Sequence, residues 1–156
     1  MNLNPTFALA RIWPVILASV FFAGAATAVA GTAKFEAQVV WATNDENQPN
    51  DKYKPVGPET QRKLESLGLK WKKFYVVKRV EFEAKNGESG KVAISEKSSL
   101  SVKIRADKKV EVIFYGKNGE ECSRRVQTFK PGEMLVHGGN VQENATAWLV
   151  TLKQVK

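Results

Sequence analysis

The sequence predicts an all-β protein: an antiparallel β-sandwich or partly open barrel of seven to eight strands, with one short helix near residues 58–67. Three observations lead to this prediction. Beyond residue 34, apolar residues mostly alternate with polar ones, as they do in half-buried strands. Short turn sequences, including two copies of Lys-Asn-Gly-Glu, interrupt this alternation at short intervals. The chain of 156 residues is also long enough to bury a core within one domain.

Residues 1–30 have the order of a signal peptide. A short polar start ends at Arg11, an apolar stretch follows, and small residues lead up to Ala30. We expect cleavage after Ala30, export to the periplasm or the medium, and a single β domain over residues 31–156. The open alternative is an uncleaved anchor, because residues 12–30 carry no charge and just suffice to cross a bilayer. Only that alternative would make the membrane a partner.

The helix is predicted between the first strand, over residues 35–41, and the strands that follow. Leu64 and Leu67 share one face of this helix, which is barely three turns long. Gly68 suits the left-handed conformation that ends many helices.

A meander of consecutive hairpins is predicted from about residue 73 to 129. Because a slip of one residue exchanges the two faces of a strand, apolar residues must pair with apolar residues. Three-residue loops satisfy this condition, with Gly at the left-handed position where the loop is Lys-Asn-Gly. The predicted pairs are Val80 with Val92, Val102 with Val112, Ile104 with Val110, Val110 with Val126, and Phe114 with Cys122. A last strand, from about residue 145 to 155, places Trp148, Val150 and Leu152 on one face.

The composition excludes several classes of site. The chain has one cysteine, Cys122, and one histidine, His137. It can therefore form neither an intramolecular disulfide framework nor a zinc site built on several cysteines or histidines. His137 stands beside two glycines, where we expect a turn residue without a catalytic role. We expect no enzyme activity, no cofactor and no metal; an irregular calcium site in the acidic 44–57 loop, which lacks the EF-hand spacing, is the alternative.

A cluster of cationic and aromatic residues between positions 70 and 79 is the main binding candidate. Cationic groups suit phosphate, sulfate or carboxylate, and aromatic rings stack on bases or sugars. The alternative is that Trp71 and Phe74 belong to the core and that the lysines form a solvated face that protects a sheet edge. The candidate binding residues are Lys70, Trp71, Lys72, Lys73, Tyr75, Lys78 and Arg79.

Two further features have open interpretations. Cys122 is either a small buried hydrophobic residue opposite Phe114 or, in an exported protein, one half of an intermolecular disulfide. A second basic group forms either a binding surface or the rim of the sheet, and the predicted register places Arg124 opposite the apolar Val112. This second group consists of Arg124, Arg125, Lys103, Arg105, Lys108 and Lys109.

Three stretches of the chain resemble a family of small exported bacterial β proteins with no assigned activity. They are Phe35–Asp45, Gly132–Asn140 and Ala147–Val150. The resemblance spans nearly the whole chain after residue 31. It implies export and a compact β fold, and it brings no catalytic residues to this sequence.

The sequence thus favours an exported, non-catalytic binding or structural module of the bacterial cell envelope. Its expected partner is an unknown envelope protein, met through sheet edges or a basic face. One alternative is a binder of anionic polymer or membrane headgroups through residues 70–79, and a second is a small exported hydrolase. The sequence has no specific nucleic-acid-binding motif.

Overall fold

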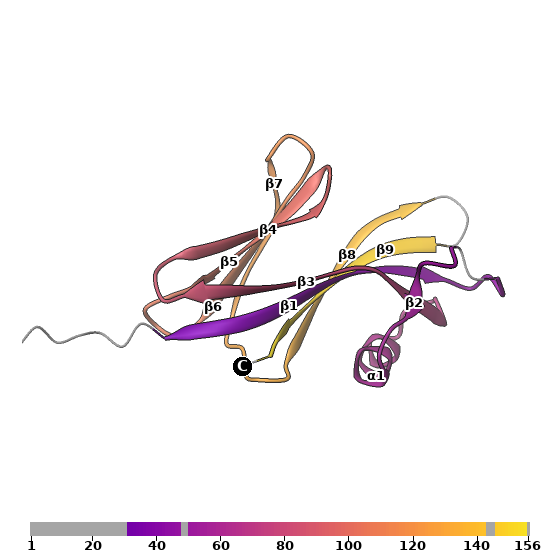
Figure 1. Ribbon diagram of the computed structural model, residues 1–156, viewed down its shortest axis with the longest axis horizontal. Helices are drawn as coiled ribbons and strands as arrows, with labels where there is room; N and C mark the ends of the chain where they lie inside the picture. The colour runs from indigo at the N-terminus through magenta and orange to yellow at the C-terminus, as the bar shows by residue number, and fades with distance from the viewer. Residues whose placement is uncertain (1–30, 48–49, 143–145, 156) are drawn as a thin grey trace, which may run out of the picture.

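The computed structural model describes residues 31–47, 50–142 and 146–155, so the expected leader lies outside the described residues. Within them, nine strands and one helix form two antiparallel sheets that do not close into a barrel (Figure 1). The prediction of an all-β sandwich is confirmed. The five-stranded sheet has the order β2-β3-β1-β9-β8, and the four-stranded sheet the order β4-β5-β6-β7. The elements are β1 Thr32–Thr43, β2 Lys54–Pro55, α1 Pro58–Ser66, β3 Lys73–Lys85, β4 Ser89–Ser95, β5 Ser98–Ile104, β6 Val110–Tyr115, β7 Glu121–Gln127, β8 Met134–Gln142 and β9 Thr146–Gln154.

The long strand β1 buries a different face at each of its two ends. At its start, Phe35 and Ala37 pack in the core shared with the four-stranded sheet. Further along, Val40 and Ala42 point the other way and pack in a second core beside α1. We call these two sides of the five-stranded sheet the inner face and the outer face. In Figure 1 the four-stranded sheet lies at the left of and above β1 and β3, and α1 lies below their right-hand end.

The last strand, β9, also contributes to both faces. Trp148, Val150 and Leu152 share the inner face, as predicted, because they are opposite odd-numbered residues of β1. Ala147 and Leu149, between them on the outer face, are nearly fully buried in the core beside α1. The alternation that predicted a half-buried strand is therefore, for part of its length, a strand buried on both sides.

The helix α1 begins and ends as the sequence predicts. Its first residue is Pro58, whose fixed φ suits a first helical position, and Gly68 just after its end has φ +64°. Leu64 is fully buried and anchors the helix on the outer face. Leu67 lies at the last helical turn and is 45% exposed, so only one of the two leucines enters the core.

Two of the predicted turns are confirmed in detail. The Ala-Asp-Lys turn pairs Ile104 with Val110 and Val102 with Val112. At the second Lys-Asn-Gly loop, the backbone N–H of Gly116 donates to the carbonyl of Glu120 (2.9 Å), and Gly119 has φ +75°. Both loops therefore have three residues, as the parity of the apolar positions required.

A bulge at Cys122 reverses the predicted pairing beyond this loop. Tyr115 is opposite Glu121, and Phe114, which precedes Tyr115 in β6, is opposite Ser123. Cys122 is therefore the extra residue of a bulge in β7. Every later side chain of β7 therefore lies on the face opposite to the predicted one. The predicted pairs Val110 with Val126, Phe114 with Cys122 and Val112 with Arg124 are wrong; the observed ones are Val110 with Gln127, Val112 with Arg125 and Ile113 with Arg124.

The predicted pair of Val80 with Val92 is also wrong, because β3 and β4 belong to different sheets. Val80 is opposite Ala37 of β1. The first Lys-Asn-Gly turn is a corner at which the chain passes from the five-stranded to the four-stranded sheet, and Asn86 there forms a parallel bridge with Ile104. The predicted meander thus holds from β4 to β7 but excludes β3.

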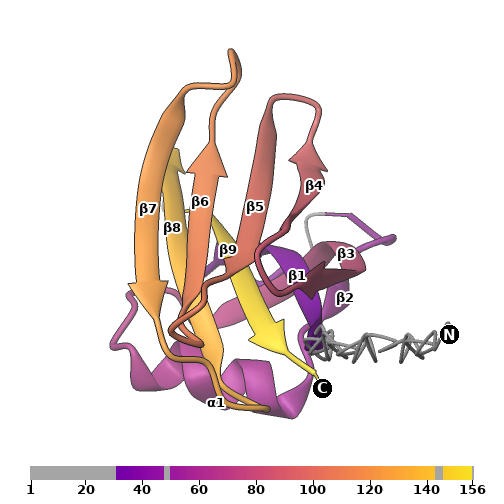
Figure 2. The same cartoon turned by 90° about the vertical axis from the view of Figure 1, so that its left-hand side faces the viewer.

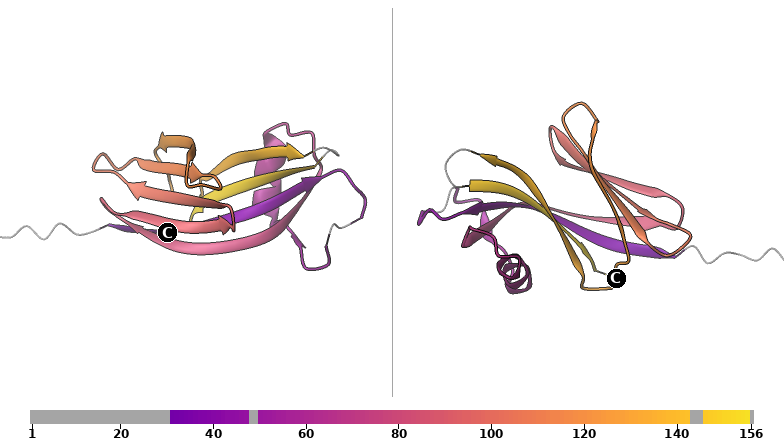
Figure 3. Two further views of the ribbon diagram at one scale, coloured as in Figure 1. Left: turned by 90° about the horizontal axis from the view of Figure 1, so that it is seen from above. Right: turned by 180° about the vertical axis from the view of Figure 1, so that it is seen from behind.

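The two sheets diverge from their shared core, as the view from behind in Figure 3 shows. The inner face of the five-stranded sheet is covered at the end that begins β1. Its outer face is covered by α1 at the opposite end. Among the described residues, each face consequently has one covered and one uncovered half.

Candidate functional site: an aromatic cleft

A row of three aromatic side chains crosses the inner face of the five-stranded sheet. Tyr75, Trp41 and Trp148 are register partners on the neighbouring strands β3, β1 and β9, so their side chains share one face. The rings of Trp41 and Trp148 meet edge to face, with centroids 4.6 Å apart and planes at 75°. All three residues are half-buried, whereas Phe35 and Leu152 at the other end of the same face are fully buried. The row lies on the uncovered half of the inner face, which we call the aromatic half.

A cleft of about 1120 Å³ opens beside this row, between the two sheets. One wall comes from β1, β3 and β9, and the other comes from the four-stranded sheet. We call it the aromatic cleft. Clefts that hold small molecules are mostly apolar and have about 300–1,000 Å³, so this one is large enough for such a ligand. Its apolar lining includes Val39, Val77, Ile94, Phe114, Trp148 and Val150.

An imidazole stacked on a phenyl ring joins the two sheets within this cleft. His137 of β8 lies over Phe114 of β6, with ring centroids 4.0 Å apart and planes at 13°. Burial lowers the pKa of His137 below its ordinary value of 6.5, and the positive charge of Arg125 lowers it further. In the part of the chain that the structure describes, the imidazole has no hydrogen-bonding partner. His137 is therefore mainly neutral at pH 7 and serves as a packed ring.

Lys78 brings a positive charge to the wall of the cleft. Its side chain crosses from β3 to β4, where Nζ donates a hydrogen bond to the carbonyl oxygen of Ala93 (2.9 Å). Among the described residues, Lys78 has no carboxylate partner within ion-pair distance. Glu96 and Lys97, in the turn after β4, also line the cleft, and their charges cancel. With His137 neutral, the lining carries one net positive charge.

The predicted binding residues at 70–79 do not form one surface. Trp71 is 9% exposed and packs in the core beside α1, as the alternative interpretation of this segment predicted. Tyr75 and Lys78 lie on the inner face. Arg79 lies on the outer face, with its Nε 3.7 Å from Glu36. Their shared role in binding an anionic polymer stays a prediction, and the fold divides them between two surfaces.

The three lysines at the start of residues 70–79 contact residues that lie close to them in the fold. Nζ of Lys70 lies 5.1 Å from the centroid of the Trp71 ring. Nζ of Lys73 donates to the carbonyl oxygen of Glu46 (3.1 Å). The backbone N–H of Lys72 donates to the side chain of Asn44 (2.9 Å), and its own side chain is exposed. These contacts fix the connection between α1 and β3.

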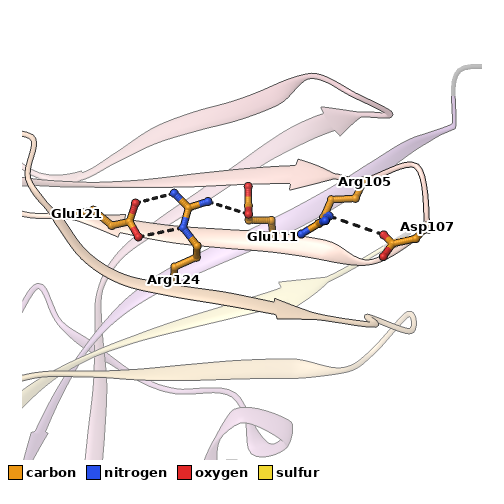
Figure 4. A network of polar contacts seen from close by, with 5 residues as sticks. All are labelled: Arg105, Asp107, Glu111, Glu121 and Arg124. Carbon is orange, nitrogen blue, oxygen red and sulfur yellow. Dashed lines mark hydrogen bonds and ion pairs between the residues drawn. The ribbon is translucent and has the colours of Figure 1, made fainter.

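Three of the six residues of the second basic group, Arg105, Lys109 and Arg124, are paired with carboxylates, and Figure 4 shows two of them, Arg105 and Arg124. Arg124 donates two hydrogen bonds to Glu121 (2.9 and 2.6 Å) and one to Glu111 (2.7 Å). These bonds raise the pKa of Arg124, and they lower that of Glu121. At the far end of β6, Asp107 lies 3.9 Å from Arg105; a hydrogen bond from the backbone N–H of Lys109 lowers the pKa of this aspartate, and nearby cations lower it further. Such paired charges are typical of a solvated rim.

Cys122 is exposed, so the prediction of a buried residue opposite Phe114 is wrong. It is the extra residue of the bulge in β7, and its Sγ lies 3.7 Å from the carbonyl oxygen of Glu120. The exposure is compatible with an intermolecular disulfide, which stays a prediction.

The described residues contain neither a cluster of metal ligands nor a helix that could span a membrane. Over residues 31–47, 50–142 and 146–155, no three side chains of His, Cys, Asp or Glu come together in a way that could hold a metal ion. In the same ranges, no helix has the length and hydropathy needed to cross a membrane.

No protein-family model, no curated protein and no solved structure matches this chain. The resemblance to small exported β proteins and the expected export therefore stay predictions, and the candidate site depends on the geometry described above.

The sequence interpretation did not select Trp41 and Trp148 as functional residues. Both stand at alternate positions with other apolar residues, Trp41 after Ala37 and Val39 and Trp148 before Val150, which is the ordinary pattern of core residues. One signal was available. Val39, Val40, Trp41 and Ala42 form an unbroken apolar run, which indicates a strand that needs partners on both faces. The structure supplies only part of that cover on the inner face.

Proposed function

We propose that this chain is an exported, non-catalytic binding module of the bacterial cell envelope, and that its aromatic cleft takes an amphipathic ligand with an acyl chain. The observation that carries the proposal is the row of Tyr75, Trp41 and Trp148, which are half-buried and belong to neither core of the described residues. Apolar side chains left in contact with water cost free energy, and contiguous ones mark binding surfaces. The expected leader supports the export part of the proposal.

The geometry of the row favours an aliphatic chain over a flat ring. The planes of Trp41 and Trp148 are 75° apart, so no single sugar or base can stack on both rings. Val39 and Val150, which are opposite each other in register, extend the apolar surface from the tryptophans toward the core. A flexible chain can follow such a corner because it needs no planar partner. The charge of Lys78 suits an anionic headgroup at the cleft wall.

Quenching by a brominated fatty acid tests this function, because bromine quenches an indole only on contact. In a variant that keeps only Trp41 and Trp148 (Trp13→Phe and Trp71→Phe), we expect dibrominated palmitate to quench the fluorescence saturably. In the matched variant that keeps only Trp71, on the covered outer face, we expect little quenching. Unbrominated palmitate controls for changes of environment, and a short brominated acid controls for collision in solution.

A second variant tests the headgroup. Lys78→Gln removes the positive charge from the cleft wall, and we expect it to weaken palmitate binding by about ten-fold, the effect of one well-placed charge pair. Lys97→Gln serves as the matched control, because it removes the same unit of charge from the turn after β4 and leaves Lys78 in place. Equal quenching of Trp71 and of the Trp41–Trp148 pair, or no saturable quenching of either, would contradict the proposal.

The two alternative functions gain less support. A binder of anionic polymer through residues 70–79 would need one continuous surface, whereas Trp71, Tyr75 and Arg79 lie in different places. A hydrolase that uses His137 would need a partner to orient its imidazole, and this ring instead stacks on Phe114.

A further inference from the structure

The strand β8 forms a free edge of the five-stranded sheet. It stands at the end of the strand order, and its single neighbour in that order is β9. The backbone groups on the edge of β8 that points away from β9 therefore meet no other strand of the two sheets. An edge of this kind can pair with an added strand, and proteins that do not use such an edge commonly blunt it with charges or proline. From Met134 to Gly138, β8 contains neither.

A hollow of about 890 Å³ runs along this edge. One side is formed by the end of β7, with Arg125 and Gln127, and the other by α1, with Lys63 and Leu67. Figure 2 shows β7 and β8 on the same side of the molecule, with α1 beneath them. The stacked pair of His137 and Phe114 lines both this hollow and the aromatic cleft. An extended segment placed along β8 would thus lie between two walls.

The cations of this hollow are available to a ligand, and its carboxylates are engaged. Among the described residues, Arg125 and Lys63 form no ion pair. Glu59 is paired with Lys153 of β9, and the Glu133 carboxylate accepts a hydrogen bond from the backbone N–H of Lys130 (3.0 Å). Because a backbone hydrogen bond does not neutralise the Glu133 carboxylate, the hollow carries one net positive formal charge once Lys153 is counted. Of the described residues, Arg125 and Lys63 are its two cations without an ion pair, and they lie beside unpaired strand backbone.

We propose that the β8 edge binds an extended, acidic peptide segment of a partner protein by strand addition. The main-chain hydrogen bonds of the added strand extend the five-stranded sheet. Because alternate residues of a strand point to opposite faces, one set of peptide side chains meets β7 and the other meets α1. Carboxylates in the first set pair with Arg125, and apolar side chains in the second set cover Leu67, which is 45% exposed. This site shares the stacked pair of His137 and Phe114 with the aromatic cleft, but it does not depend on the proposed acyl ligand.

Charge argues against a second copy of this chain as the occupant. The chain has a formal net charge of +8, and pairing of two β8 edges would bring two copies of Arg125 and Lys63 toward one another. Like charges that face one another across an interface suppress association.

The test follows the backbone amides of residues 134–138 of the full chain by NMR hydrogen exchange. The probe is an acetylated and amidated peptide of about nine residues that alternates Glu and Val, a length typical of paired strands. We expect this peptide to slow exchange of the outward amides of β8. The same peptide with a central proline, which lacks a strand hydrogen bond, is expected to give no protection.

Charge-reversal variants of the hollow distinguish a loss of peptide recognition from a loss of folding. Arg125→Glu is expected to weaken binding of the Glu-Val peptide by about ten-fold or more and to favour the matched Lys-Val peptide instead. Lys63→Glu gives a second, independent reversal on the α1 wall. Lys130→Glu, an exposed change outside the hollow, is expected to leave the affinity within about two-fold. The amide spectrum of each variant confirms that it is folded.

Three results would overturn the proposal. The first is an absence of protection at residues 134–138 with every peptide. The second is unchanged affinity of the Glu-Val peptide for both Arg125→Glu and Lys63→Glu. The third is protection of the β8 amides that rises with protein concentration alone, which would identify a second copy as the occupant.

Discussion

The two uncovered halves of the five-stranded sheet differ sharply in chemistry. On the outer face, the half beyond the core beside α1 is charged and paired: Lys34 lies 3.5 Å from Glu83, and Arg79 lies 3.7 Å from Glu36. We call it the polar half. On the inner face, the half beyond the four-stranded sheet carries the aromatic row centred on Trp41. Both halves belong to the same strands, so strand propensity cannot explain the difference.

The contrast is the reason for placing the proposed function on the aromatic half. One face of an antiparallel sheet can face water, and it is then normally polar, as the polar half is. The aromatic half departs from this rule, because it is uncovered and yet apolar, whereas the polar half follows the rule. A ligand that covers Trp41 and Trp148 would restore the missing contact, which is why we place function there.

The largest expected effect concerns the element that covers the outer face. Leu64→Ala removes a fully buried side chain from the core beside α1, and it should lower the free energy of unfolding by about 2–5 kcal/mol. Leu67→Ala, in the same helix but 45% exposed, should change it by no more than about 0.5 kcal/mol. Urea unfolding of both variants measures the difference. Equal effects would mean that α1 does not cover this half, and the comparison would lose its basis.

A smaller effect is expected within the polar half. Gln38 is 4% exposed, its amide nitrogen donates to Glu36, and its Oε1 is buried without a partner. Gln38→Met keeps the volume and removes the unsatisfied oxygen, so the free energy of unfolding should rise by about 1 kcal/mol. Gln38→Glu should lower it, because two carboxylates would then face each other. A Met variant that is less stable than the parent in urea would contradict this prediction, because it would mean that the buried amide of Gln38 stabilises the fold.

The smallest expected effect is a dependence of the free energy of unfolding on pH, which arises from His137 at the boundary of the aromatic half. Burial and then Arg125 lower the pKa of His137 below 6.5, so the folded state takes up its proton less readily than the unfolded state. Stability is therefore unaffected above pH 6.5 and is lost as the pH falls below it, toward the lowered pKa. His137→Phe keeps the stack on Phe114 and removes the proton.

Urea unfolding between about pH 7 and about pH 5.5, above the range in which most carboxylates titrate, measures this dependence, because these limits lie on either side of the pKa of an ordinary histidine. The parent should lose stability over that interval, and His137→Phe should lose less. Parallel curves for the two proteins would contradict the burial of His137.

The register of β7 shows the limit of predicting strand pairing from the pattern of apolar residues. The parity of apolar residues correctly predicted both three-residue loops, because each loop length is tied to the faces of the strands it joins. It failed beyond Cys122, since a bulge changes the parity within a strand and leaves no distinctive residue in the sequence. The predicted pairing did place the charged Arg124 opposite Val112. The observed pairing places Arg125 opposite the same valine, so a charge at that position gave no sign of the extra residue.

The course of β3 and the aromatic half were beyond sequence reasoning for another reason. A Lys-Asn-Gly turn has the same local chemistry whether the chain turns back in its own sheet, as after β6, or leaves for the other sheet, as after β3. Likewise, Trp41 and Phe35 stand in one alternating strand, and only the extent of the four-stranded sheet makes one half-buried and the other fully buried. Long-range packing, which the sequence pattern does not encode locally, decides both.

The accessibility of the tryptophans in the ligand-free protein tests the central claim most directly. Acrylamide quenching compares the variant that keeps only Trp41 and Trp148 with the variant that keeps only Trp71, which is 9% exposed. If the aromatic half is uncovered, the Trp41–Trp148 pair is quenched more steeply than Trp71. Quenching of Trp71 that equals or exceeds that of the pair would contradict the account.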